Sequence, residues 1–562
     1  MRIEYQTQRL SHRFFVLMLV LFAVQVVFGL IVGAQRVEPA LLSGALNFNV
    51  ARSEHTNLGI LWILSGFIGT ILYVGPLLSK RELASPWLVK LLFYALIVVV
   101  AWNVFTLTLA QRGIAGWWAG QPWLQEGLEY IDAGRGADVV ILIGFAILAT
   151  IVLRTFPAMK QWNEIHWGLA IGVSALTVVC VFGMFFVERL DGQEYFRWFV
   201  VHYWVEGVWE VIHISLIGFL IVLMFGANVR TVGYAVFWGV TLVWLSGLLG
   251  NAHHYFWIGT PEFWQFWGSL FSALEPLPLI FCFWHIYLDA HQDGKPIANM
   301  PAFAFLLGSV VLEQVGAGIL GFTMTFALTN VWSHGTWVTL SHAHLALFGT
   351  FGMLGLSAAY FAVPVMRGAT DFDQRPGRLA FWLVFTGMLG LAFAFAIGGT
   401  VQVFVYRTLG LDWFGGDVAP AMLFAKAMVP VFGIVFAAGV CLLAYDLLTL
   451  GLRERPAARD DTALPAPAGW GRRLSGWETG MWLLAMWVFG AVITLGLLSF
   501  NLHTVQQGSA LFPYLMGGIG YPGLLLVTLF FVRRFLRSLE ARGRVSLVPL
   551  ELTAAPSPAG AA

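Results

Sequence analysis

Long apolar runs, separated by short polar or charged segments, make up most of the chain. Fourteen of these runs reach about 20 residues, the length that an α-helix needs to cross the hydrocarbon core of a bilayer. The runs lie at approximately residues 13–33, 57–79, 87–110, 137–155, 165–187, 200–226, 231–250, 262–289, 302–327, 336–365, 378–401, 420–447, 476–499 and 511–534. We therefore expect an all-α polytopic membrane protein. The first run should remain as a helix, because no clear cleavage site follows it.

Polar residues divide the chain into segments. Arg, Pro and Ala are concentrated after the twelfth run, so residues 451–475 are expected to link a twelve-helix body, 1–450, to a two-helix extension, 476–540. Residues 541–562 are rich in Ala and Pro and are expected to be disordered. Lys and Arg are more frequent at the run ends on the side of the N-terminus, which predicts that both termini and the linker face the cytoplasm.

Composition excludes several classes of protein. Hydrophobic residues make up 59% of the chain and charged residues only 11%, against about 25% charged in a soluble domain. Too few charges are present to coat a soluble enzyme or a nucleic-acid binder. Three cysteines lie in apolar runs, which argues against a disulfide framework. The sequence contains no CxxCH motif, so the chain carries no c-type heme of its own.

Histidines gather on the non-cytoplasmic side of the expected bundle. Six of them belong to four different runs and share a similar depth: His55, His202, His253, His254, His342 and His344. A single intramembrane histidine is usually a structural hydrogen-bonding residue, but random placement would scatter six across both sides. For each of the other histidines, among them His213, we favour a structural hydrogen-bonding role.

The spacing of these residues predicts more than one centre. His342 and His344 are two residues apart and point about 200° away from each other on a helix, so they suit two different centres. His202 and Glu206 are four apart and share a face. The adjacent pair His253 and His254 lies where a helix is expected to end, so both can reach one metal.

Three imidazoles and one carboxylate form a ligand set that suits iron. Zinc would also accept His202, His253, His254 and Glu206, whereas a copper site does not usually recruit a glutamate. Two further histidines, His55 and His344, would suit a bis-histidine heme. His342 alone would leave a heme with one open face, where small-molecule chemistry can occur.

Buried carboxylates accompany the histidines. A carboxylate at membrane depth costs about 2.5–3.5 kcal/mol, so Glu210 and Glu275 should be paired, bound to metal or used to move protons. The alternative is a neutral glutamate that is hydrogen-bonded to backbone. Glu313 and Lys426 are also intramembrane charges, and the sequence suggests no role for them. An outer loop carries three carboxylates in seven residues, Glu126, Glu129 and Asp132, which form either a solvated acidic loop or a calcium site.

Four motifs resemble one family. They are RSEHTNLG, HYWVEGVWE, HHYFWIGTPEFWQFWGSLFSALEPLP and SHAHLALFG. Over about residues 10–450 the chain resembles the large catalytic subunit of bacterial nitric oxide reductase, of the cytochrome c-dependent type, in the heme–copper oxidase superfamily. The resemblance implies a heme–copper oxidase-like twelve-helix bundle, here with two extra C-terminal transmembrane helices, in the bacterial cytoplasmic (inner) membrane.

The resemblance also implies roles for individual residues. His55 and His344 would bind a low-spin heme b, and His342 would bind a high-spin heme b3. His202, His253, His254 and Glu206 would hold a non-heme iron. Glu206, Glu210 and Glu275 would serve catalysis at the binuclear centre, Glu129 would bind calcium, and Arg52 matches an arginine of that region. Two NO, two electrons and two protons would give N₂O and H₂O, with electrons from a membrane-anchored cytochrome c subunit and protons from the outer side.

Two departures and two rival functions remain. The family's usual GRE before the calcium glutamate reads GLE here, with Leu128. The two C-terminal helices are additional to the family's usual twelve, so the sequence does not define the interface with the partner subunit. An oxygen-reducing terminal oxidase is the first rival, but such oxidases place a tyrosine where this chain has Glu206. A proton-coupled transporter is the second, and it predicts no heme.

Overall fold

The computed structural model describes residues 3–114, 121–124, 134–185, 187, 189–225, 227–278, 280, 299–369, 372–408, 418–452, 474–501 and 511–540. Within these ranges every regular element is a helix, as expected for a chain whose backbone groups must be satisfied inside lipid. The α-helices are α1 (Ser11–Val37), α2 (Phe48–Ser79), α3 (Pro86–Gln111), α4 (Arg135–Thr155), α5 (Glu164–Gly183), α6 (Leu190–Tyr203), α7 (Glu210–Phe225), α8 (Val229–Gly250), α9 (Phe263–Leu274), α11 (Met300–Leu312), α12 (Gly321–Thr325), α13 (Ala327–Ser333), α14 (Trp337–His344), α15 (Met353–Met366), α16 (Arg375–Gln402), α17 (Val418–Ala421), α18 (Leu423–Thr449), α19 (Gly476–Leu498), α20 (Leu511–Pro513) and α21 (Tyr521–Glu540).

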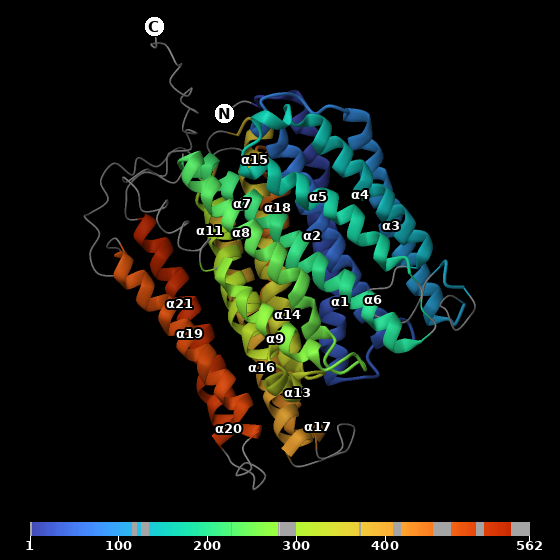
Figure 1. Ribbon diagram of the computed structural model, residues 1–562, viewed down its shortest axis with the longest axis vertical. Coiled ribbons are helices and arrows are strands. Elements are labelled where there is room, and N and C mark those ends of the chain that lie inside the picture. Colours follow the sequence, from blue (N-terminus) through green and yellow to red (C-terminus); the bar gives the residue numbers. More distant parts are fainter. Residues whose placement is uncertain are drawn as a thin grey trace.

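The expected spans are confirmed almost throughout. Thirteen helices in the described part of the chain are long and apolar enough to cross a membrane, and each overlaps one of the fourteen runs. The remaining run, 262–289, begins with α9 and continues into residues outside the described ranges. The linker residues 453–473 and the tail 541–562 also lie outside them. The helices run side by side as one bundle (Figure 1).

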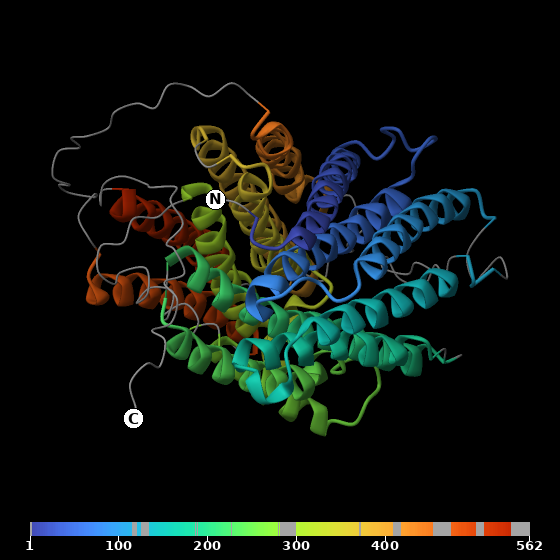
Figure 2. The ribbon, with the colours of Figure 1, turned by 90° about the horizontal axis from the view of Figure 1, so that it is seen from above.

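Burial separates a central group of helices from a peripheral one. We compared the most apolar stretch of 18 residues in each span. Between 89% and 94% of this stretch is buried in four spans, Phe48–Ser79, Leu190–Met224, Met300–Thr325 and Trp337–Met366, against 28% in Leu423–Thr449. Seen from above, the central helices are enclosed, with α3 and α4 on one flank and α19 and α21 on the opposite one (Figure 2). Four of the six histidines that the sequence analysis grouped belong to these central helices, and the other two, His253 and His254, contact His202.

Several long helices contain a π-helical segment. These wider turns are η4 (Trp204–Trp209), η6 (Glu313–Leu320), η7 (Leu345–Gly352), η8 (Val403–Thr408) and η12 (Tyr514–Gly520). A π-helical turn inserts one extra residue and re-aims the side chains that follow, and such turns are frequent at functional sites. Three of them, η4, η6 and η7, lie in the central helices.

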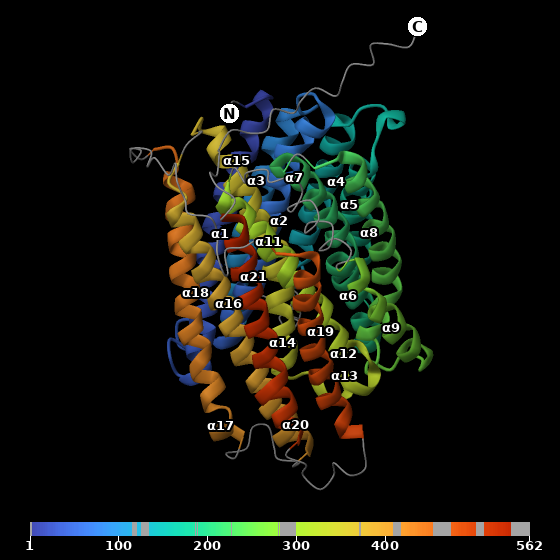
Figure 3. The ribbon, with the colours of Figure 1, turned by 90° about the vertical axis from the view of Figure 1, so that its left-hand side faces the viewer.

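The two C-terminal helices form a hairpin along one side of the bundle (Figure 3). Arg534 on α21 makes a bidentate ion pair with Glu478 on α19, at 3.0 and 3.1 Å. The hairpin also packs on the body, where the Phe535 ring stacks on Phe303 of α11 at 6.3 Å. The two expected extra helices are therefore packed against the body.

Candidate metal centre

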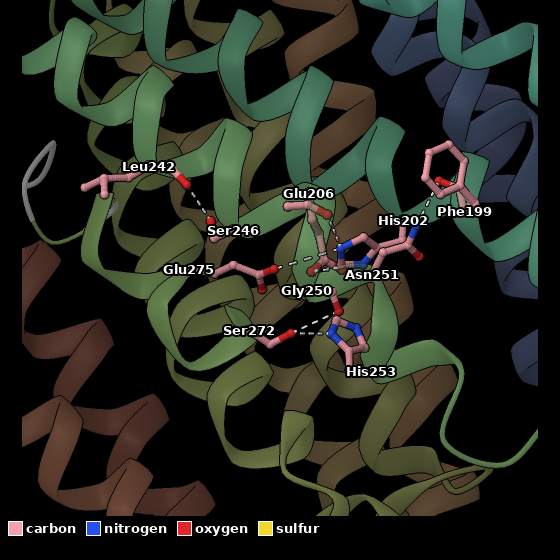
Figure 4. Close-up of polar contacts among 11 residues, drawn as sticks. Phe199, His202, Glu206, Leu242, Ser246, Gly250, Asn251, His253, Ser272 and Glu275 are labelled. Carbon is pink, nitrogen blue, oxygen red and sulfur yellow. Dashed lines mark hydrogen bonds and ion pairs between the residues drawn. The ribbon is translucent and has the colours of Figure 1, made fainter. Parts of the chain in front are cut away.

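Four predicted ligands come together from three neighbouring segments. His202 lies near the end of α6, Glu206 in η4, and His253 and His254 in the 3-10 turn η5 (Asn251–His254) that ends α8. One ligand atom of each lies within 4.8 Å of the others. The cluster lies where these segments meet α9 (Figure 4). The structure thus brings together the residues that the sequence spacing grouped.

Hydrogen bonds aim the histidine rings at the cluster. His202 Nε2 donates to the Gly247 carbonyl at 3.0 Å. Its Nδ1 is buried without a hydrogen-bond partner and lies 3.5 Å from Glu206 Oε2. The Ser272 hydroxyl donates to the Gly250 carbonyl at 3.2 Å and so accepts from His253 Nδ1 at 2.6 Å, which leaves His253 Nε2 available (Figure 4). A buried imidazole nitrogen that has no hydrogen-bond partner and lies beside a carboxylate is suited to bind a metal ion.

Packing holds the remaining ligands in place. The His254 ring stacks on Trp198 of α6, with ring centroids 4.3 Å apart and planes at 7°. A side chain at Gly247 of α8 would collide with the Glu206 carbonyl, so only glycine lets α8 approach the π-helical turn η4 this closely. A Cβ at Gly268 of α9 would lie 2.6 Å from His253 N. Both contacts fix the backbone from which the ligands project.

The three histidines expected to bind heme share one feature. Each directs Nδ1 to a backbone carbonyl: His55 to Gln25 at 3.1 Å, His342 to Gly316 at 2.7 Å, and His344 to Leu340 at 2.8 Å. A metal-bound histidine usually donates its second ring N–H in this way, which leaves Nε2 as the ligand atom. The residues therefore fit the axial ligands of hemes.

The rings of His55 on α2 and His344 on α14 lie close together. Their ring centroids are 6.1 Å apart and their planes 26° apart. The two imidazoles are therefore close enough that they would hold one heme iron between them. The Gln25 side-chain amide lies 3.2 Å from His55 Nε2, so it would have to turn aside for that nitrogen to bind a metal. His342 belongs to the same helix as His344 but faces the other side, toward η6.

The predicted acidic residues have different surroundings. Glu275, which follows α9, places Oε1 3.9 Å from His202 Nε2, and that oxygen is buried without a hydrogen-bond partner (Figure 4). Glu210 begins α7, one turn beyond Glu206, and is 4% exposed. Both lie next to the cluster, although neither is among the four grouped ligands. Glu129, like Glu126 and Asp132, lies outside the described residues.

Sequence reasoning missed a buried pair beside this centre. His213 Nδ1 of α7 lies 3.2 Å from Glu313 Oε1 of η6, and His213 Nε2 is 2.9 Å from the Ser309 hydroxyl of α11. Both side chains are at most 1% exposed. The only available signal was that each is an ionisable residue at membrane depth. The two residues are 100 positions apart in the sequence, so no local spacing indicates the contact.

Comparisons with known proteins show which family the chain resembles. Residues 9–441 match the family model described as cytochrome c and quinol oxidase polypeptide I. The chain is 31% identical over 476 residues to a nitric oxide reductase subunit of Stutzerimonas stutzeri, covering 83% of this chain and 98% of that protein. Among solved structures, a heme–copper terminal oxidase dimer matches with a TM-score of 0.60 at 16% identity, over 87% of this chain and 91% of that one. The last likeness concerns the fold alone.

Proposed function

The chain belongs to the heme–copper oxidase family, a family of multi-pass membrane oxidoreductases with heme and metal cofactors, and we propose that it reduces nitric oxide. The reaction is 2 NO + 2 e⁻ + 2 H⁺ → N₂O + H₂O. The relative in Stutzerimonas stutzeri, which is named for nitric oxide reductase, supports this choice.

One observation carries the proposal: a carboxylate completes the cluster of three histidines. Glu206 lies within 4.8 Å of the nitrogens of His202, His253 and His254. Three imidazoles and a carboxylate suit iron better than copper. The oxygen-reducing oxidases that the sequence resembles have a tyrosine at this position. We therefore assign a non-heme iron to the cluster and a high-spin heme b3 to His342.

The proposed centre pairs two metals. His342 would hold the heme, and the cluster of three histidines and Glu206 would hold the non-heme iron. Together these groups would supply the chemistry for joining the nitrogens of two NO molecules. The protein's part is to hold the ligands rigidly, through the Gly247 and Gly316 carbonyls and the Ser272 hydroxyl, and to exclude water. NO is small and apolar and reaches the buried site from the bilayer.

Protons and electrons follow separate paths in this proposal. Glu275 and Glu210, buried beside the cluster, hold and pass the two protons that the reaction consumes. His55 and His344 would hold a low-spin heme b, which would supply the entry point for electrons. A membrane-anchored cytochrome c subunit supplies these electrons, since the chain has no CxxCH motif. The chain lies in the bacterial cytoplasmic membrane with both termini in the cytoplasm, and Glu129 binds calcium.

The experiment is a gas balance on the purified chain. With ascorbate and a redox mediator as electron source, we expect NO to disappear and N₂O to form in the ratio of the reaction. Glu262→Gln, an exposed residue at the start of α9, should behave as the parent. Oxygen consumption without NO consumption under the same conditions would contradict the proposal and favour a terminal oxidase.

A further inference from the structure

His342 is held by a segment that approaches it unusually closely. Its Nδ1 donates to the carbonyl of Gly316 in η6 at 2.7 Å. A Cβ at Gly316 would lie 2.6 Å from Leu345 Cβ, so η6 presses directly on the backbone that follows His342. At Gly321, the first residue of α12, a Cβ would lie 3.4 Å from His342 Cε1. The position of the His342 ring therefore depends on where η6 and α12 lie.

The C-terminal hairpin contacts these same two segments. Gly490 in the middle of α19 lies against Ile319 of η6, and a side chain there would collide with Ile319 Cγ2. Three residues earlier, Trp487 packs edge-on against Phe322 of α12, with ring centroids 5.7 Å apart. Both contacts lie within one turn of α19, so this turn covers the segment that holds His342.

A second set of contacts fixes the end of α19. The Asn501 side chain donates to the Leu328 carbonyl at 2.8 Å and accepts from Trp332 Nε1 at 3.3 Å. The Trp332 and Phe500 rings lie 4.9 Å apart. Leu328 and Trp332 belong to α13, which follows α12 directly. The hairpin is thus attached to three consecutive segments, η6, α12 and α13.

We propose that the C-terminal hairpin, described over residues 476–501 and 511–540, is a positioning element for His342. It holds η6 against α14 so that the Gly316 carbonyl keeps its hydrogen bond to the His342 ring. This inference rests on the proposed function, since it takes His342 as the axial ligand of a heme. The hairpin lies beyond residues 9–441, to which the family model extends.

The expected consequence follows from the role of that hydrogen bond. An Nδ1–H that donates to a carbonyl makes the imidazole a stronger electron donor, and loss of such a partner typically costs 10–100-fold in metal affinity or activity, by order of magnitude. π-helical turns are rare and occur frequently at functional sites. Pushing η6 away through α19 should therefore weaken the iron–histidine bond without changing any ligand.

The test uses two glycines of the same helix. Gly490→Ala introduces a methyl group that collides with Ile319, whereas Gly480→Ala places the same group where nothing lies within 4 Å. Resonance Raman spectra of the reduced protein report the Fe–His stretching band. Hydrogen exchange of the amides of residues 313–320 reports on η6 without reference to heme. A double variant, Gly490→Ala with Ile319→Ala, removes the colliding atoms.

In Gly490→Ala we expect the Fe–His band to move to lower wavenumber. We expect the η6 amides to exchange roughly tenfold faster, because overpacking destabilises this segment locally. Gly480→Ala should match the parent, and the double variant should return toward it. An unchanged band and unchanged exchange in Gly490→Ala would overturn the inference. If the band responds but the parent consumes no NO, the proposed function fails and the positioning role stands. A parent without a histidine-bound, five-coordinate heme would overturn both.

Discussion

The proposed choice of metal rests on Glu206. It lies 3.5 Å from His202 Nδ1, which has no hydrogen-bond partner, so in the proposed iron site it would supply both a negative charge and an oxygen ligand. A neutral amide of the same shape keeps the packing but loses the charge that attracts a cation. The chemical identity of this one side chain, rather than the fold, separates the proposed iron site from a copper site.

Substitution of Glu206 tests this directly. In Glu206→Gln we expect the non-heme iron content to fall at least about tenfold while both hemes remain, because the heme ligands are untouched. Elemental analysis together with heme extraction measures the two separately. Glu262→Gln, the same change on an exposed residue, should retain all the iron. Full iron occupancy in Glu206→Gln would exclude Glu206 as a ligand.

The His213–Glu313 pair makes a different prediction. Both side chains are buried, so removing one partner leaves the other without compensation, which costs about 3–5 kcal/mol of folding free energy. We expect Glu313→Leu to melt well below the parent. The double variant Glu313→Leu with His213→Leu should recover most of the loss, since an apolar pair of similar size fills the space. Thermal melting followed by heme absorbance measures both, and equal losses in the two variants would contradict the pairing.

At the scale of elements, the π-helical turns distinguish this bundle from a set of regular helices. Glu206 lies in η4, Gly316 in η6, and η7 begins directly after His344. Each turn re-aims the residues around it by one extra position. Regular α-helical spacing correctly placed His202 and Glu206 together, but it could not show that η6 supplies the carbonyl that His342 needs.

Gly247 tests the support of η4. Gly247→Ala places a methyl group against the Glu206 carbonyl, and overpacking of this kind costs about 1–3 kcal/mol. We expect lower iron occupancy and slower NO consumption, because the turn that carries Glu206 must move. Gly75→Ala in α2, where nothing lies within 4 Å, is the matched control. Equal iron content in the two variants would show that η4 tolerates the shift.

At the scale of the whole molecule, the sequence predicted the spans and the ligand cluster for one physical reason. Apolar length and repeated helical faces are local properties, and the six histidines could be placed at one depth from the ends of their own spans. Contacts between distant spans are not local. The pairing of His213 with Glu313 and the contact of Gly490 with Ile319 depend on how helices pack, and no sequence spacing encodes that.

Metal and heme content of the purified chain tests the central claim most directly. Elemental analysis with a pyridine hemochrome assay gives the number of hemes, the total iron and the copper per chain. The account predicts two b-type hemes and a third iron, with no copper. One copper per chain would contradict the iron assignment at His202, Glu206, His253 and His254, and a chain without heme would contradict the whole account.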